Sequence, residues 1–235
     1  MEKRIIKKKS ITQYANFLFI LFLILFQSCK TEETKQTIKI LFIGNSITHH
    51  VQASQIGWFG DWGMAASSRD NDYVHQLIKM LEDNYPNKQF DFKEQNVADW
   101  ELNFSKDLNS YSDIINYESD VLIIRLGENV PEYYAQLNNY SDALEKLVSF
   151  YKTNTTSVIV TGNFWESKYK DNVQKQIAEK NNYYYVALSD LSNDKNNMAL
   201  EEYDNYDVGK HPSDKGMKEI AIKIFNCIKA NSIVK

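Results

Sequence analysis

The first candidate for chemistry is Ser46, which follows a short apolar run and a glycine. Residues 38–43 predict a buried strand, and Gly44 permits the unusual backbone angles of a tight turn. Such a turn can lift the Ser46 hydroxyl above the edge of a sheet, where a base can reach it. The pattern differs from the G-x-S-x-G nucleophile elbow. A serine here can equally be a plain turn former, so Ser46 needs partners before it becomes a nucleophile.

Asn129 and His211 are the partners that acyl transfer needs. Asn129 closes the segment Gly127-Glu128-Asn129 after another apolar run, and its amide can point an N–H at a developing oxyanion, a contact worth about 3 kcal/mol. His211 stands beside Pro212 at the start of the last expected helix, where a positioned imidazole can act as a general base. The plainer interpretations are a loop asparagine that bonds its own backbone and a histidine in a surface turn.

The elements that would position these residues alternate between strand and helix. The expected strands are 38–43, 89–97, 121–124, 158–160 and 183–188, and the expected helices are 72–84, 140–151, a segment around 173–177 and one that starts near 213. This alternation implies a parallel sheet with helices on both faces. Sites in such sheets form at the carboxyl ends of the strands. Ser46, Asn129 and Trp165 all follow expected strands there.

Gly44-Asn45-Ser46, Gly127-Glu128-Asn129 and His211-Pro212 together resemble the nucleophile, G-x-N and terminal histidine blocks of the SGNH (GDSL-like) hydrolases. Their order and rough positions agree over residues 38–230. Residues 56–67 are further similar to a subgroup of Bacteroidetes lipoproteins. The resemblance implies a flavodoxin-like three-layer α/β/α sandwich with a parallel sheet of about five strands. It also implies an acyl-enzyme on Ser46 and no cofactor.

The sequence departs from the family pattern in two places. The family has a glycine after the second strand whose backbone N–H binds the oxyanion, but residues 95–99 contain none. The backbone N–H of Ala98 is expected to serve instead. The family also has an aspartate three residues before the histidine, where this chain has Val208. Either a bulge at Gly209 lets the Asp207 carboxylate orient the imidazole, or a main-chain carbonyl does so, and we favour the carboxylate.

Aromatic and histidine side chains surround the expected site. Trp62, in the long insertion after the nucleophile, and Trp165 could stack on sugar rings of a substrate. The other interpretation is that the tryptophans of the insertion fill a small core of their own loop. No carboxylate or cysteine falls at ligand spacing beside His49 and His50, so we predict no metal site.

Residues 1–29 are typical of an export signal. They hold five basic side chains and one acid, followed by an apolar run over 17–26 that is half the length of a membrane-spanning helix, about 20 residues. Ser28-Cys29 at its end resembles a lipobox and predicts lipidation of Cys29, in a periplasmic or cell-surface lipoprotein anchored in the outer membrane. An ordinary cleaved signal is the other interpretation. Residues 30–37 are polar and predict a tether, which leaves 38–235 as the hydrolase domain.

Charge narrows the classes of substrate. The net charge is −4, and the chain beyond the basic leader is more acidic still, which argues against nucleic acid as a partner. The sequence therefore predicts a serine esterase that removes O-acyl groups, such as acetyl, from carbohydrates. The alternatives are a non-catalytic glycan-binding surface lipoprotein on the same fold, or a lipase or thioesterase, which would need a long apolar groove.

Overall fold

The computed structural model describes residues 35–104 and 106–235. The expected signal sequence and the lipidated Cys29 lie outside the described residues, as does most of the expected tether. The first strand begins at Gln36, so the last two tether residues belong to the sheet, where they pair with the first two residues of the neighbouring strand. Both side chains are exposed, so polar residues are suitable at these strand positions, although their polarity predicted a tether. Within the described residues, no helix is long and apolar enough to cross a membrane.

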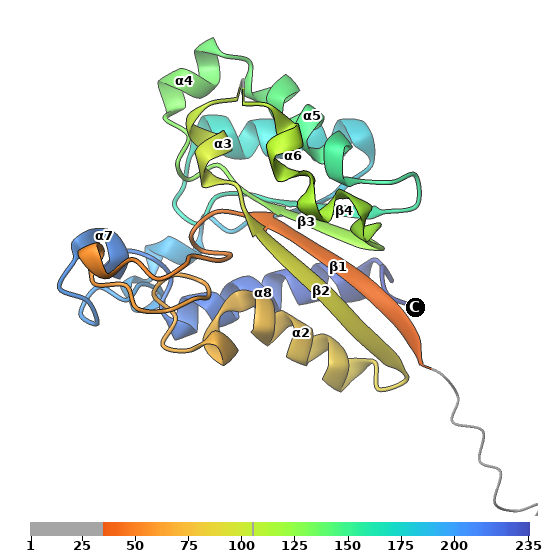
Figure 1. Cartoon of the computed structure of the whole chain (residues 1–235), viewed down its shortest axis with the longest axis horizontal. Helices are drawn as coiled ribbons and strands as arrows, with labels where there is room; N and C mark the ends of the chain where they lie inside the picture. The colour runs from red at the N-terminus through yellow and green to blue at the C-terminus, as the bar shows by residue number, and fades with distance from the viewer. Residues whose placement is uncertain (1–34, 105) are drawn as a thin grey trace, which may run out of the picture. The chain divides into compact units, whose positions relative to one another are not determined.

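Five parallel strands form one sheet in the order β2-β1-β3-β4-β5 (Figure 1). The strands are β1 (Gln36–Gly44), β2 (Lys88–Asn96), β3 (Val121–Arg125), β4 (Ser157–Thr161) and β5 (Tyr184–Val186). This is the flavodoxin-like strand order, and it confirms the predicted α/β class. The order reverses between β1 and β3, which opens a crevice at their carboxyl ends.

Alternate strand residues face two separate hydrophobic cores, as the pleat of a strand requires. On one face, Ile40 and Phe42 pack with the helices α2 (Tyr73–Asn84) and α8 (Asp214–Ala230). On the other face, Leu41 and Ile43 pack with α5 (Tyr140–Tyr151) and α6 (Lys168–Asn181). These are the four helices that apolar periodicity predicts.

The remaining helices leave no such periodicity in the sequence. Most have six residues or fewer, and the ten-residue 3-10 helix Leu108–Tyr117 is interrupted by non-helical backbone at Tyr111. These helices are α3 (Ala98–Leu102), α4 (Glu132–Leu137), α7 (Tyr206–Gly209) and the 3-10 helices Ser54–Ile56, Arg69–Asn71, Leu108–Tyr117, Leu191–Asn193 and Lys195–Asn197.

A third, smaller core joins the insertion after β1 to the segment around α7, which lies beside it in Figure 1. Trp58, at its centre, is only 2% exposed and packs edge-on against Trp62 with ring centroids 5.7 Å apart. Ala199 and Val208 contribute from the other segment. The tryptophans of the insertion therefore fill a core, and that core fixes the chain just before His211.

Candidate active site

Ser46 lies on the turn after β1, at the crevice between β1 and β3. The turn closes where the N–H groups of Thr48 and His49 donate to the Asn45 carbonyl, at 2.9 and 3.1 Å. A Cβ on Gly44 would stand 1.8 Å from the Thr48 hydroxyl oxygen. Gly44 does not have a positive φ, so the turn needs glycine for this close approach and not, as expected, for unusual backbone angles.

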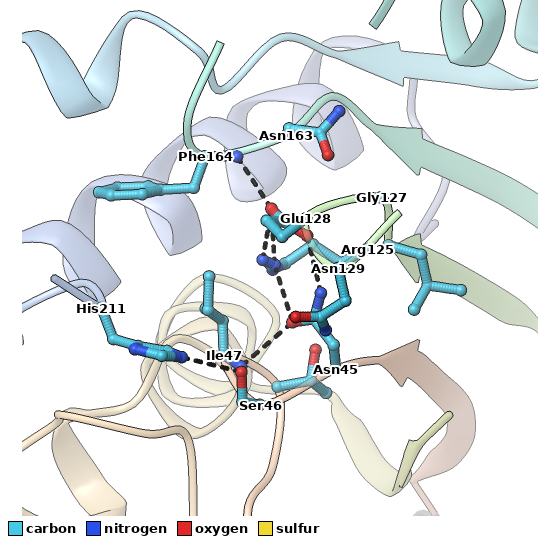
Figure 2. A network of polar contacts seen from close by, with 12 residues as sticks. Asn45, Ser46, Ile47, Arg125, Gly127, Glu128, Asn129, Asn163, Phe164 and His211 are labelled. Atoms are coloured by element: carbon cyan, nitrogen blue, oxygen red, sulfur yellow. Dashed lines mark hydrogen bonds and ion pairs between the residues drawn. The ribbon is translucent and has the colours of Figure 1, made fainter. Parts of the chain in front are cut away.

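The Ser46 Oγ lies 2.9 Å from Nε2 of His211 (Figure 2). The other ring nitrogen, Nδ1, lies 2.7 Å from the main-chain carbonyl oxygen of Asp207. Because a carbonyl can only accept, this contact places the ring hydrogen on Nδ1 and leaves the Nε2 lone pair facing the serine hydroxyl. The ring is also held edge-on against Trp165, with centroids 5.9 Å apart.

The Asp207 carboxylate does not take the role that we favoured for it. It binds the ammonium of Lys210 at 2.7 Å, and its side chain is 80% exposed. The expected bulge at Gly209 is absent because residues 206–209 form a helical turn, α7. In a helical turn the main-chain carbonyl of residue i points toward residue i+4. Asp207 thus presents its carbonyl to His211, while its side chain points to solvent.

The surroundings of His211 favour the neutral imidazole. Burial lowers the pKa of His211 to about 4; the Asp207 carbonyl acts in the opposite direction, and the Lys210 ammonium lowers the pKa further. At neutral pH the ring is therefore uncharged and can accept a proton from Ser46.

Asn129 shares two cavities with Ser46 and His211, so the structure brings these three predicted residues together. The Nδ2 group of Asn129 donates one hydrogen to Oε2 of Glu101 at 2.6 Å, which fixes the direction of the amide. Its second hydrogen is available for a ligand. The preceding Gly127 has φ +126°, a conformation that L side chains rarely adopt, so glycine is required at this loop.

Ala98 lines the same cleft but does not offer the expected oxyanion donor. Its N–H donates to Oδ1 of Asn96 at 2.8 Å, two residues earlier. Asparagine commonly bonds the backbone two residues on in this way, so the N–H is already engaged.

A buried carboxylate, Glu101, supports the Asn129 loop and was not predicted from the sequence. It is fully buried and accepts hydrogen bonds from the Gly127 N–H, the Asn129 amide and, at 3.3 Å, the Asn45 amide. Burial and the nearby Glu128 carboxylate raise the pKa of Glu101. Glu101 lies in the five-residue helix α3, where no spacing marks it as functional.

Glu128 and Arg125 form a second part of this network beside the turn of Ser46 (Figure 2). The fully buried Arg125 donates to the Glu128 carboxylate at 2.7 and 3.2 Å. The same carboxylate accepts from the Asn45 amide at 2.7 Å and the Phe164 N–H at 2.9 Å. The network therefore ties the loops after β1, β3 and β4 together.

Lys170 of α6 completes the support of the Asn129 loop. Its buried ammonium donates to the carbonyls of Gly127 and Val130, each at 2.7 Å, on either side of Asn129. Burial lowers the pKa of Lys170, while the neighbouring carboxylates, Glu128 first among them, oppose that shift. The loop is held on both sides, so Asn129 is positioned before any ligand arrives.

The two tryptophans singled out for sugar binding have different positions. Trp165 lines a cavity with Ser46 and His211. Trp62 packs on Trp58 and donates its ring N–H to the Ala66 carbonyl at 2.8 Å, so it belongs to the third core.

The adjacent histidines His49 and His50 have protein partners. His49 pairs with Asp61 at 3.1 Å, and Nδ1 of His50 lies 2.6 Å from the Val51 carbonyl. In the part of the chain that the structure describes, no group of three or more His, Cys, Asp or Glu side chains could hold a metal ion.

Comparison with known proteins gives structural matches only. No protein-family model and no curated protein matches the chain. A two-domain esterase (CEX) active on acetylated mannans, co-crystallised with mannopentaose, superposes with a TM-score of 0.58 at 15% identity over 93% of this chain and 55% of that one. The chain thus spans about half the length of that esterase.

Two shorter structures match over almost their whole length. A Parabacteroides merdae protein described as a GDSL-like lipase has a TM-score of 0.56 at 17% identity, covering 85% of this chain and 98% of that one. An acetyl xylan esterase has a TM-score of 0.51 at 16% identity, covering 81% and 100%. The chain is therefore structurally similar to SGNH (GDSL-like) esterases, and at these identities the likeness defines the fold.

Proposed function

We propose that this protein is a serine esterase of the SGNH type that removes O-acyl groups, acetyl among them, from carbohydrates. The observation that carries the proposal is the relay from the Asp207 carbonyl through His211 to the Ser46 hydroxyl, at 2.7 and 2.9 Å. It lies at the carboxyl ends of β1 and β3, where ligands bind in sheets of this order.

In the proposed reaction the Ser46 oxygen attacks the ester carbonyl as Nε2 of His211 takes the hydroxyl proton. The tetrahedral intermediate collapses, the bond to the sugar oxygen breaks, and His211 returns the proton to that oxygen. The acyl group now forms an ester with Ser46. A water molecule, deprotonated by His211, releases the acyl group as a carboxylic acid and restores the serine.

The negative oxygen of each intermediate would be stabilised by the second amide hydrogen of Asn129 and the main-chain N–H of Ser46. Asn129 suits this role because Glu101 and Lys170 fix its loop in advance. A donor that needs no reorientation contributes most to such stabilisation. The Ala98 N–H is left out of this step because Asn96 already accepts it.

The carbohydrate part of the proposal is supported by the character of the cleft. Trp165 offers an aromatic face beside the nucleophile, and polar side chains such as Asn205 and Lys210 line the walls. Structural neighbours that act on acetylated mannans, or that are named acetyl xylan esterases, agree with this chemistry.

A non-catalytic glycan-binding protein is the second candidate, because among the described residues the Nδ1 of His211 contacts a main-chain carbonyl and no carboxylate. Two experiments separate the candidates. Hydrolysis of 4-nitrophenyl esters and sugar acetates is measured for wild type and for Ser46→Ala, with Ser192→Ala, outside the cleft, as the matched control. An esterase loses turnover only in Ser46→Ala; a binding protein shows no turnover in any form and retains glycan affinity in all of them.

We also propose that the protein is exported and anchored by a lipid on Cys29. The support is the basic, short apolar leader that ends at Ser28-Cys29. An acyl-sugar hydrolase of this kind would then meet its substrates at the cell surface or in the periplasm.

A further inference from the structure

The cleft over Ser46 continues in two directions. A central cavity of about 440 Å³ holds Ser46 and His211 and shares both with a second cavity, also about 440 Å³, that extends to Trp165. The central cavity also adjoins a third, of about 600 Å³, with which it shares Ile56 and Asn205. We call these three cavities together the groove. Ser46 thus lies along the groove and not at the end of a blind pocket.

Each part of the groove carries one large hydrophobic side chain that is left exposed. Phe59 in the third cavity is 70% exposed and Tyr206 in the second is 71% exposed, while Leu102 lines the central one. Phe59 and Tyr206 therefore offer flat apolar surfaces in the two cavities that adjoin the central one. Such surfaces suit the apolar face of a sugar ring. A single exposed aromatic residue on a protein surface is ordinary, but exposed aromatic residues along one groove indicate a ligand.

The third cavity is acidic. Glu202 and Asp204 line it, and neither has an ion-pair partner among the described residues. In the central cavity, Asp207 is paired with Lys210 and Asp99 with Lys106. The two unpaired carboxylates repel anionic ligands that approach the third cavity. Esters that carry phosphate or uronate groups are therefore poor candidates, and an uncharged substrate fits better.

We infer that the groove binds an uncharged, O-acylated polysaccharide lengthwise, with sugars stacked on Phe59 and on Tyr206 and an acyl group of the sugar between them at Ser46. This inference rests on the proposed function. The hydroxyl released is that of an internal sugar, so the glycosidic bonds are not broken. A long substrate gains both aromatic contacts, whereas a single acylated sugar at Ser46 cannot span the second and third cavities to gain both.

The first test compares substrate lengths. We expect wild type to have a higher kcat/KM per acetyl group on acetylated mannan than on an acetylated methyl mannoside. Phe59→Ala and Tyr206→Ala should each lower the ratio of mannan to 4-nitrophenyl acetate activity by about three- to tenfold. Tyr133→Ala is the matched control, because Tyr133 is 68% exposed but lies outside the groove. Equal activity on both lengths, with unchanged ratios in both variants, would overturn the inference while leaving the esterase intact.

The second test measures binding without turnover. Ser46→Ala is titrated with acetylated mannopentaose by calorimetry, alone and combined with Phe59→Ala. The inference expects measurable binding that the added substitution weakens about three- to tenfold. Binding that Phe59→Ala leaves unchanged contradicts it. If Ser46→Ala binds acetylated mannopentaose through Phe59 but the wild-type protein hydrolyses no ester, the result would contradict the proposed esterase function. It would still support the groove as the polysaccharide-binding site.

The third test concerns charge. Acetylated polygalacturonate carries acetyl esters on a polyanionic chain, and wild type should hydrolyse it at least tenfold less efficiently than acetylated mannan at low salt. Glu202→Gln combined with Asp204→Asn, or added salt, should narrow that gap. Equal efficiency on both polymers at low salt would contradict the charge argument.

Discussion

His211 is oriented by the main-chain carbonyl of Asp207, 2.7 Å from its Nδ1, and not by the carboxylate of that residue. The orientation of His211 therefore depends on the helical turn α7, which directs the Asp207 carbonyl toward the ring, and not on the position of a carboxylate in the sequence. A carbonyl fixes the tautomer as well as a carboxylate can, but it adds no negative charge to stabilise the imidazolium that forms during catalysis.

Asp207→Asn should therefore keep kcat within about threefold of wild type, because the backbone contact remains and an exposed ion pair contributes little. His211→Ala should lose activity by several orders of magnitude, since His211 is the base that contacts Ser46 in the described part of the chain. Steady-state kinetics on 4-nitrophenyl acetate compares the two. A loss in Asp207→Asn on the order of 10⁴-fold would show that the carboxylate acts on the imidazole after all.

The pH profile should extend unusually far to the acid side. Burial lowers the pKa of His211 to about 4, so the base stays neutral above that value and activity falls only as the pH drops through about 4. An unperturbed histidine would lose its activity near pH 6.5. The profile of kcat/KM, with circular dichroism at each pH to confirm folding, distinguishes the two. Because burial also raises the pKa of Glu101 to about 7, the profile is measured in Glu101→Gln as well, which cannot titrate there. An acid limb near 6.5 that persists in folded Glu101→Gln would contradict the burial argument.

Glu101→Gln should lower kcat more than it changes KM. The carboxylate accepts hydrogen bonds from Gly127 and Asn129, and an amide would present a donor to one of them. Asn129 would then lose its direction, with a loss on the order of ten- to a hundredfold, below the 10²–10³ of losing an oxyanion donor outright. Glu179→Gln, on the exposed face of α6, is the control. A Glu101→Gln enzyme with wild-type kcat would remove Glu101 from the positioning of the loop.

Lipid attachment is tested by Cys29→Ser. The wild-type protein, expressed with its leader in a bacterial host that lipidates exported proteins, should partition into the detergent phase. The variant should remain in the aqueous phase or keep its leader. Mass spectrometry of the wild-type N-terminus provides the direct measurement. An unmodified Cys29 in the mature protein would refute the anchor.

Much of the fold could be predicted because its long elements carry strong apolar patterns. The strand at Val121 and the helix from Tyr140 to Tyr151 are visible as a continuous apolar run and a helical stripe, and the structure has both. Ser46, Asn129 and His211 could be found because they follow or precede such elements. Their convergence then follows from a parallel sheet, whose carboxyl ends lie at one edge.

The supporting residues could not be predicted in the same way. Glu101 and Lys170 act through tertiary contacts, and neither stands at a spacing that suggests chemistry. The prediction for the Asp207 carboxylate is wrong because a four-residue helix is too short to leave a periodic signal, and this helix turns the carbonyl of Asp207, not its side chain, toward His211. The prediction for the Ala98 N–H is wrong because the Asn96 side chain, two residues earlier, already accepts its hydrogen bond.

The central claim is that Ser46 is a nucleophile activated by His211, and active-site labelling with a fluorophosphonate tests it most directly. Intact-protein and peptide mass spectrometry should find one phosphonyl group, on the peptide that contains Ser46. His211→Ala should slow that labelling by several orders of magnitude, and Asp207→Asn should leave its rate close to wild type. A folded wild-type protein that is not labelled, or a label on another residue that persists in Ser46→Ala, would contradict the account.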